Sequence, residues 1–210
     1  MKYEDNSVNI NRGTGDVEGD SRNYHHGDLR AKALKLGMEI IEKQEHPELG
    51  LRALARQLGV SATALYRHFP SKDALFDAFA LEALNRLGEH QAQAAKAAGG
   101  GRLGFAEVGI TYVAWAVANP SLLRLINTRI QSVDLGQQDN SDMGEALRQL
   151  KTGIAAMLPP NIAEERRIAA ELHAWSLVHG LSMLILDGLV KHDPKLVRQV
   201  VSLASFHSAP

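Results

Sequence analysis

Apolar residues recur every three or four positions along this chain, from Gly27 almost to its C-terminus. This spacing gathers apolar side chains on one face of an α-helix, whereas a half-buried strand alternates with a period of two. No segment alternates convincingly in that way, and no internal repeat is visible. The chain is therefore predicted to be all-α, with about nine helices and no sheet.

Glycine, proline and polar stretches divide this helical pattern into regions. Residues 1–22 are polar and lack periodicity, which is typical of a disordered tail. Gly99-Gly100-Gly101 interrupts the pattern after a long helix. We expect a first helical domain over 23–72, a connecting helix over 73–98 and a second helical domain over 99–210.

Residues 51–69 predict two short helices, over 51–58 and about 62–68, joined by a tight turn. Gly59 stands where the first helix must stop, and a left-handed residue at that point costs least as glycine. Ser61 can accept a backbone N–H as N-cap of the second helix, and Ser71 can cap the next one. This layout is typical of a DNA-binding helix-turn-helix.

The second short helix is expected to present Thr63, Tyr66 and Arg67 outward. Its first residues would meet base edges in the major groove, where Thr63 offers a hydroxyl and a methyl group. The alternative is a helical hairpin inside an ordinary bundle, with Tyr66 and His68 in the core. Small residues at 62–64 fill a bundle poorly but suit close approach to a groove.

Three strings in this region resemble the DNA-binding domain of TetR-family regulators. They are residues 24–30 (YHHGDLR), 59–61 (GVS) and 65–75 (LYRHFPSKDAL), and together the resemblance covers about 60 residues. One departure is Gly50-Leu51 ahead of Arg52, where the family often has a Ser or Thr cap. The resemblance implies a dimeric repressor that releases DNA when a small ligand enters the C-terminal domain.

The resemblance also implies which residues contact double-stranded operator DNA. Tyr66, His68 and Lys72 suit phosphate oxygens, and Arg52 can reach backbone or base. The full candidate set consists of Arg52, Ser61, Ala62, Thr63, Ala64, Tyr66, Arg67, His68 and Lys72. Region 99–210 is then expected to bind the effector and to form the dimer.

The long helix expected over 162–188 carries two apolar stripes and therefore needs two partners. One stripe contains Leu172, Trp175 and His179, and the other contains Leu177 and Leu184. One partner is its own domain; the other is expected to be the same helix of a second copy, together with the helix over 194–205, in a homodimer. The alternative is a helix simply central to its own domain. Trp175, His179 and Gly180 also resemble the Trp-His-Gly signature of one TetR C-terminal subclass.

Aromatic and apolar residues of the second domain are candidates for an effector pocket. The set consists of Tyr112, Trp115, Leu122, Leu123, Ile126, Trp175, His179 and Met183. Residues at this helical spacing are more often core, and a lone histidine such as His179 is more often a satisfied core group than a ligand contact. The expected effector is small and mainly apolar. Control by a protein partner is the alternative.

Other classes of protein find little support in the sequence. There is no cysteine, no phosphate loop, no nucleophile motif and no histidine pair with metal-ligand spacing, so we expect no enzyme, no metal and no cofactor. The N-terminus has no apolar run, and no stretch approaches the 18 or so apolar residues of a membrane span. The protein is expected in the cytoplasm. A net charge of −1 does not mark a nucleic-acid binder, so that prediction depends on the motif.

Overall fold

The computed structural model describes residues 26–43, 49–130 and 144–206, and these residues form helices joined by turns. The all-α prediction is confirmed, with nine helices in the described part of the chain. The expected tail over 1–22 lies outside the described residues. The helices are α1 (His26–Glu42), α2 (Leu51–Gln57), α3 (Ala62–Tyr66), α4 (Lys72–Ala97), α5 (Gly101–Ala118), α6 (Pro120–Arg129), α7 (Glu145–Ala155), α8 (Glu164–Leu186) and α9 (Pro194–Phe206).

Turn and cap chemistry sets the ends of the short helices. Gly59 has a φ of 68°, in the left-handed region that favours glycine. The hydroxyl of Ser61 accepts the Ala64 N–H at 3.2 Å, and the hydroxyl of Ser71 accepts the Ala74 N–H at 3.0 Å. Both predicted N-caps are therefore confirmed. Gly50 is the N-cap residue of α2 and offers no side-chain cap, as the departure from the family pattern indicates.

Helix α3 is shorter than the expected range of 62–68 and ends at Tyr66. The N–H groups of His68 and Phe69 both donate to the Leu65 carbonyl, at 3.0 and 2.9 Å, so the last turn tightens and closes there. Pro70 follows and disfavours a helical conformation at the residue before it. His68 consequently lies in the turn after α3.

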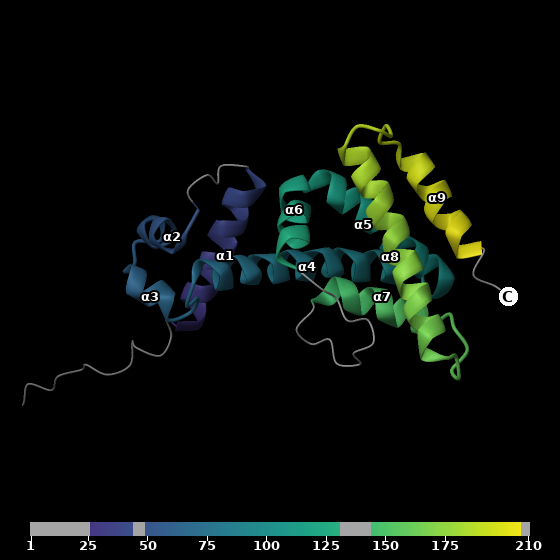
Figure 1. The fold of residues 1–210 in the computed structure, drawn as a ribbon, viewed down its shortest axis with the longest axis horizontal. Coiled ribbons are helices and arrows are strands. Elements are labelled where there is room, and N and C mark those ends of the chain that lie inside the picture. The colour runs from purple at the N-terminus through teal and green to yellow at the C-terminus, as the bar shows by residue number, and fades with distance from the viewer. Residues whose placement is uncertain (1–25, 44–48, 131–143, 207–210) are drawn as a thin grey trace, which may run out of the picture.

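The long helix α4 joins the two parts of the molecule (Figure 1). Helices α1, α2 and α3 gather around its N-terminal end, and α5, α7, α8 and α9 surround its C-terminal end. Helix α6 lies between these groups and packs on both α4 and α1. Helix α3 stands at the extremity of the molecule, on the far side from α9.

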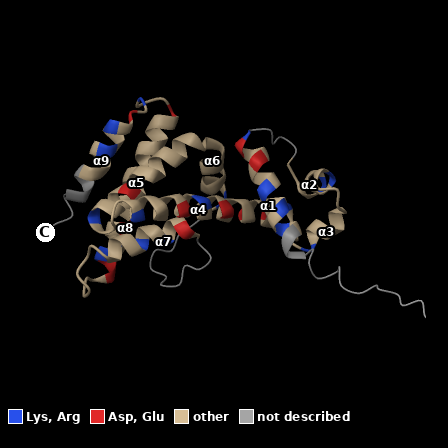
Figure 2. Ribbon diagram, turned by 180° about the vertical axis from the view of Figure 1, so that it is seen from behind, with Lys and Arg blue, Asp and Glu red and all other residues tan. Residues whose placement is uncertain are grey.

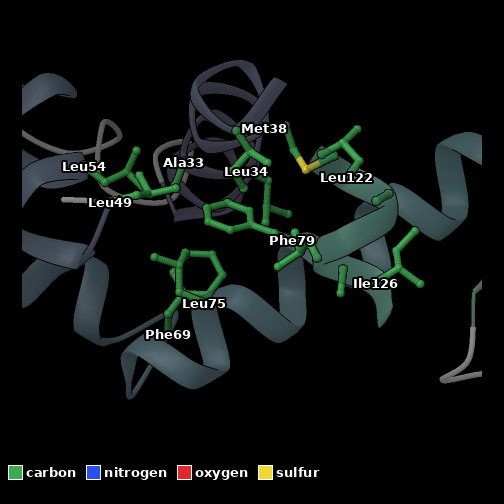
Figure 3. Packing of buried hydrophobic residues seen from close by; sticks show 14 of the residues in the cluster. Ala33, Leu34, Met38, Leu49, Leu54, Phe69, Leu75, Phe79, Leu122 and Ile126 are labelled. Carbon is green, nitrogen blue, oxygen red and sulfur yellow. The ribbon is translucent and has the colours of Figure 1, made fainter. Parts of the chain in front are cut away.

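One apolar core runs through α1–α4 and into α6. Phe79 of α4 is fully buried and lies between Leu34 and Met38 of α1 and Leu122 and Ile126 of α6 (Figure 3). Helices α1 and α4 approach closely at Gly37, where an added Cβ would stand 2.1 Å from the Phe79 ring. The core therefore crosses from the first expected domain into the second, because α6 contributes side chains to it.

A second, smaller core joins α5, α8 and α9. Its buried members are the aliphatic side chains Val113, Val178, Ile185, Val197 and Val201. An ion pair between Arg198 of α9 and Glu107 of α5 connects the same helices at the surface. This core holds α8 by one narrow face.

Helix α8 is 23 residues long, yet only Glu171, Val178, Ser182 and Ile185 are buried on it. Between Glu171 and Asp187 it carries no Lys, Arg, Asp or Glu. By length and composition alone it could span a membrane, which differs from the expectation that no stretch approaches this. The reason is that serine, histidine and glycine interrupt its apolar residues without adding formal charge. A buried carboxylate on this helix fits a protein environment better than lipid.

Candidate nucleic-acid interface and ligand site

The recognition helix α3 is held by its inner face and leaves its outer face open. Leu65 and Phe69 are buried to 0 and 1% exposure and anchor it in the N-terminal core. Thr63, Tyr66 and Arg67 are exposed, with 42% of Tyr66 accessible. The alternative that places Tyr66 in a bundle core disagrees with this exposure. A short helix that projects small and polar side chains can enter a major groove.

The remaining candidates at the start of α3 have different surroundings. Ser61 is exposed, but its hydroxyl is engaged as the N-cap, so it positions the helix. Ala62 and Ala64 are half-buried and offer only part of their surface. Their small size lets the backbone of this turn approach a groove closely.

The candidate phosphate-binding residues flank α3 on its neighbours. Arg52 of α2 and Lys72 at the start of α4 are exposed. The Lys72 ammonium lies 5.5 Å from the centre of the Phe76 ring, a contact that orients it. His68 is half-buried, and its ring lies 6.5 Å from that of Phe69. Lys72 and Arg52 are thus exposed cations on the helices next to α3.

Two further exposed cations lie in this region and do not belong to the expected set. Arg30 of α1 holds its guanidinium 5.6 Å from the centre of the Phe69 ring, and Arg56 occupies the last turn of α2. Basic segments along α1 and α2 are visible in Figure 2. Arg30 belongs to the 24–30 string that resembles the TetR-family DNA-binding domain, and this was the sequence signal that could have added it to the candidate set.

Three of the predicted pocket residues meet between α5 and α8. The Tyr112 hydroxyl lies 3.0 Å from Nδ1 of His179. Burial raises the pKa of Tyr112 to about 12, and a side-chain hydrogen bond with Trp175 opposes the rise. Burial also lowers the pKa of His179 from its ordinary 6.5. The indole N–H can only donate, so Trp175 donates a hydrogen bond to the Tyr112 oxygen. The Tyr112 hydroxyl in turn donates to Nδ1 of neutral His179.

The other predicted pocket residues lie apart from this trio. Trp115, Leu122 and Ile126 belong to the core shared with α1 and α4. Leu123 is buried and Met183 is half-buried. Packing against the N-terminal helices explains the burial of Leu122 and Ile126, and the place of all these residues in an effector pocket stays a prediction.

Two buried polar side chains escaped the sequence analysis. Glu171 of α8 is fully buried, and one of its oxygens accepts from Arg167 at 2.5 Å. Gln91 of α4 is 3% exposed and donates from Nε2 to the Val108 carbonyl at 3.1 Å. Within the described residues, Oε2 of Glu171 and Oε1 of Gln91 accept no hydrogen bond. Spacing could not reveal them, because glutamate and glutamine on helices are usually exposed.

Two family models match this chain. Residues 33–79 match the model described as "Bacterial regulatory proteins, tetR family", and residues 105–203 match "Tetracyclin repressor-like, C-terminal domain". Together the matches cover more than two thirds of the chain. A stretch of 50 residues is 42% identical to the nucleoid occlusion factor SlmA from Marinomonas sp. (strain MWYL1). That stretch is 24% of this chain and 25% of the relative, so the chain matches about a quarter of that protein's length.

Solved structures share the whole architecture. A protein of unknown function from Rhodococcus sp. RHA1 is 29% identical with a TM-score of 0.66, over 89% of this chain and 96% of its own. A TetR transcriptional regulator from the same organism has 20% identity and a TM-score of 0.57, over 88% and 100% of the two chains. A TetR variant from Acinetobacter baumannii AYE, solved with minocycline, has 17% identity and a TM-score of 0.51, over 86% and 94%. The last two likenesses concern the fold alone.

Proposed function

This chain belongs to the TetR family of DNA-binding transcriptional regulators, a family without enzymatic activity, and from this we propose that it is a homodimeric repressor released from its operator by a small effector. The observation that carries the proposal is the exposed outer face of α3, beside Arg52 and Lys72. In a two-fold dimer, two such helices would enter successive major grooves about 34–36 Å apart. Operator DNA lies in the bacterial cytoplasm, where we expect the protein to act.

The proposed dimer interface consists of the ranges 162–188 and 194–205. Three leucines support it, because Leu172, Leu184 and Leu196 are 51, 43 and 40% exposed within one chain. Large apolar side chains gathered on two neighbouring helices mark an interaction surface. A second copy of α8 and α9 would cover these leucines in a four-helix arrangement.

The proposed effector enters the C-terminal domain near Tyr112, Trp175 and His179. The Acinetobacter protein was solved in complex with minocycline, and this supports small-molecule binding by a protein of this fold. We also propose that Trp175, His179 and Gly180 place the domain in the Trp-His-Gly subclass. An effector acts only through its different affinities for the DNA-bound and released conformers.

Control by a protein partner is the second candidate. Leu103 and Leu189 favour it, because each is 73% exposed and lies at a helix end. A protein partner that binds these leucines would not contact Tyr112, Trp175 or His179. Substitution of Leu103 by serine would then abolish regulation.

Selection of bound DNA from a random pool tests the DNA-binding function directly. The expected result is a palindromic sequence with half-sites about one helical turn apart. A matched selection with Thr63→Ala should change the base preference, since Thr63 is exposed at the start of α3. Recovery of only unrelated sequences would contradict the proposal.

A further inference from the structure

We propose that the C-terminal domain binds an organic cation, an amine with an apolar remainder, whose nitrogen lies against Glu171 beside Trp175 and Tyr112. The inference rests on the proposed ligand-sensing function and gives the ligand a chemical class. It starts from α8, where two of the four buried side chains are polar.

Glu171 is the principal recognition group. Its side chain is 1% exposed, and Oε1 accepts from Arg167 at 2.5 Å while Oε2 accepts from no described residue. Arg167 also lies 3.6 Å from Glu164, so one guanidinium faces two carboxylates and the group carries a net negative charge. A buried carboxylate is costly unless it is fully paired, which favours a positively charged donor at Oε2.

An aromatic side chain lies one helical turn from this carboxylate. Trp175 follows Glu171 by four residues on α8, so the two are neighbours along the helix surface. Trp175 hydrogen-bonds to Tyr112 of α5, which is bonded in turn to His179. Aromatic faces attract ammonium groups, and together with a carboxylate they recognise organic cations. A neutral apolar ligand would use the rings and leave Glu171 unsatisfied.

Gln91 supplies a second acceptor on the opposite helix. Its Nε2 is fixed to the Val108 carbonyl of α5, and Tyr112 follows Val108 by one turn. The bond holds the amide in place and leaves Oε1 buried without a donor. Both open acceptors therefore lie in the layer where α4 and α8 pack against α5. Glu171 and Gln91 thus offer two acceptor oxygens and no unused donor, and this arrangement disfavours an anionic ligand.

Matched amines and alcohols test the cation directly on the full-length protein. The probes are 4-phenylbutylamine with 4-phenylbutan-1-ol, and 2-(2-naphthyl)ethylamine with 2-(2-naphthyl)ethanol, measured by isothermal titration calorimetry without DNA. We expect the amine of at least one pair to bind about tenfold tighter than its alcohol. Equal affinity within both pairs, or no binding of either amine at millimolar concentration, would overturn the proposal.

Two variants separate Glu171 from its surroundings. Glu171→Gln keeps an oxygen for Arg167 and should remove the preference for the amine, whereas Glu164→Gln, on an exposed partner of the same arginine, should keep it. Full amine preference in folded Glu171→Gln would overturn the assignment. If Glu171→Gln fails to fold, the comparison of amine with alcohol on the unaltered chain still decides the question. Amine binding that fails to release selected DNA would count against the repressor mechanism alone.

Discussion

The helices around α3 bury their large apolar side chains, whereas α8 and α9 leave several of theirs exposed. Leu54, Leu65, Leu75 and Phe79 of the N-terminal helices are buried completely within the chain. Helix α8 is more than three times as long as α2, yet it buries four side chains and exposes half of Leu172. The first region completes its core within the chain, together with side chains of α6, and its exposed residues around α3 are the proposed DNA contacts. The second leaves large apolar side chains exposed, which are the proposed contact with a second copy of the chain.

Helix α6 connects these two regions physically. Its Leu122 and Ile126 belong to the N-terminal core, and its Arg129 reaches the start of α4. The Arg129 guanidinium donates to Asp77 at 2.8 Å and to Asp73 at 3.0 Å, which raises the pKa of Arg129. Asp73 is next to Lys72 in the sequence, so a displacement of α6 would also pull on the start of α4, which is part of the proposed DNA-binding surface.

The largest expected effect is on the core that α1–α4 share with α6. Phe79→Ala should lower the free energy of unfolding by about 4 kcal/mol, because it leaves a cavity between α1, α4 and α6. Urea denaturation measures the change, with Leu103→Ala, at a 73% exposed position, as the control that should stay within about 0.5 kcal/mol. A similar loss of unfolding free energy in the two variants would contradict the distinction between the buried core and the exposed apolar positions.

A charge on the open apolar surface should separate two chains without unfolding either. Leu184→Glu places a carboxylate where the second α8 is proposed and should weaken dimer formation by about 3 kcal/mol. Analytical ultracentrifugation measures the dimer dissociation constant. Leu103→Glu, at the start of α5, is the control and should leave it unchanged. A dimer that tolerates Leu184→Glu would show that this surface has another use.

The closeness of packing in the N-terminal core can be tested with one methyl group. Gly37→Ala should cost about 2 kcal/mol, because the new Cβ would meet the Phe79 ring at 2.1 Å. Gly50→Ala is the matched control, since nothing lies within 4 Å of its Cβ. Thermal unfolding of both variants compares them. An unchanged melting temperature for Gly37→Ala would mean that α1 and α4 can move apart freely.

The smallest effects concern the polar surface of the N-terminal region. Tyr66→Ala and Lys72→Ala should each weaken binding by about 1 kcal/mol to operator and random DNA alike, because phosphate contacts do not depend on sequence. Thr63→Ala should mainly change the ratio between the dissociation constants for operator and random DNA. Fluorescence anisotropy at several salt concentrations measures both constants. The reverse pattern would exchange the roles assigned to these residues.

Much of the local structure around the proposed DNA-binding site could be predicted from the sequence. Ser61, Gly59 and Leu65 act within a few residues of their own position, so cap, turn and anchor follow from local chemistry. The end of α3 was predicted two residues too late, because a closing turn at Leu65 competes with continued helix by small energies. Of the predicted pocket, Tyr112, Trp175 and His179 come together, while Trp115, Leu122 and Ile126 pack into the N-terminal core.

Periodicity and turn residues thus settle, from the linear chain alone, the all-helical class, the helix-turn-helix and the two apolar stripes of α8. Those features depend on neighbours three or four residues away, which the order of amino acids states directly. The burial of Glu171, the open oxygen of Gln91 and the attachment of α6 to α4 depend on helices far apart along the chain. Long-range packing alone determines which side of a helix is covered, and so which charges must find a partner inside the protein.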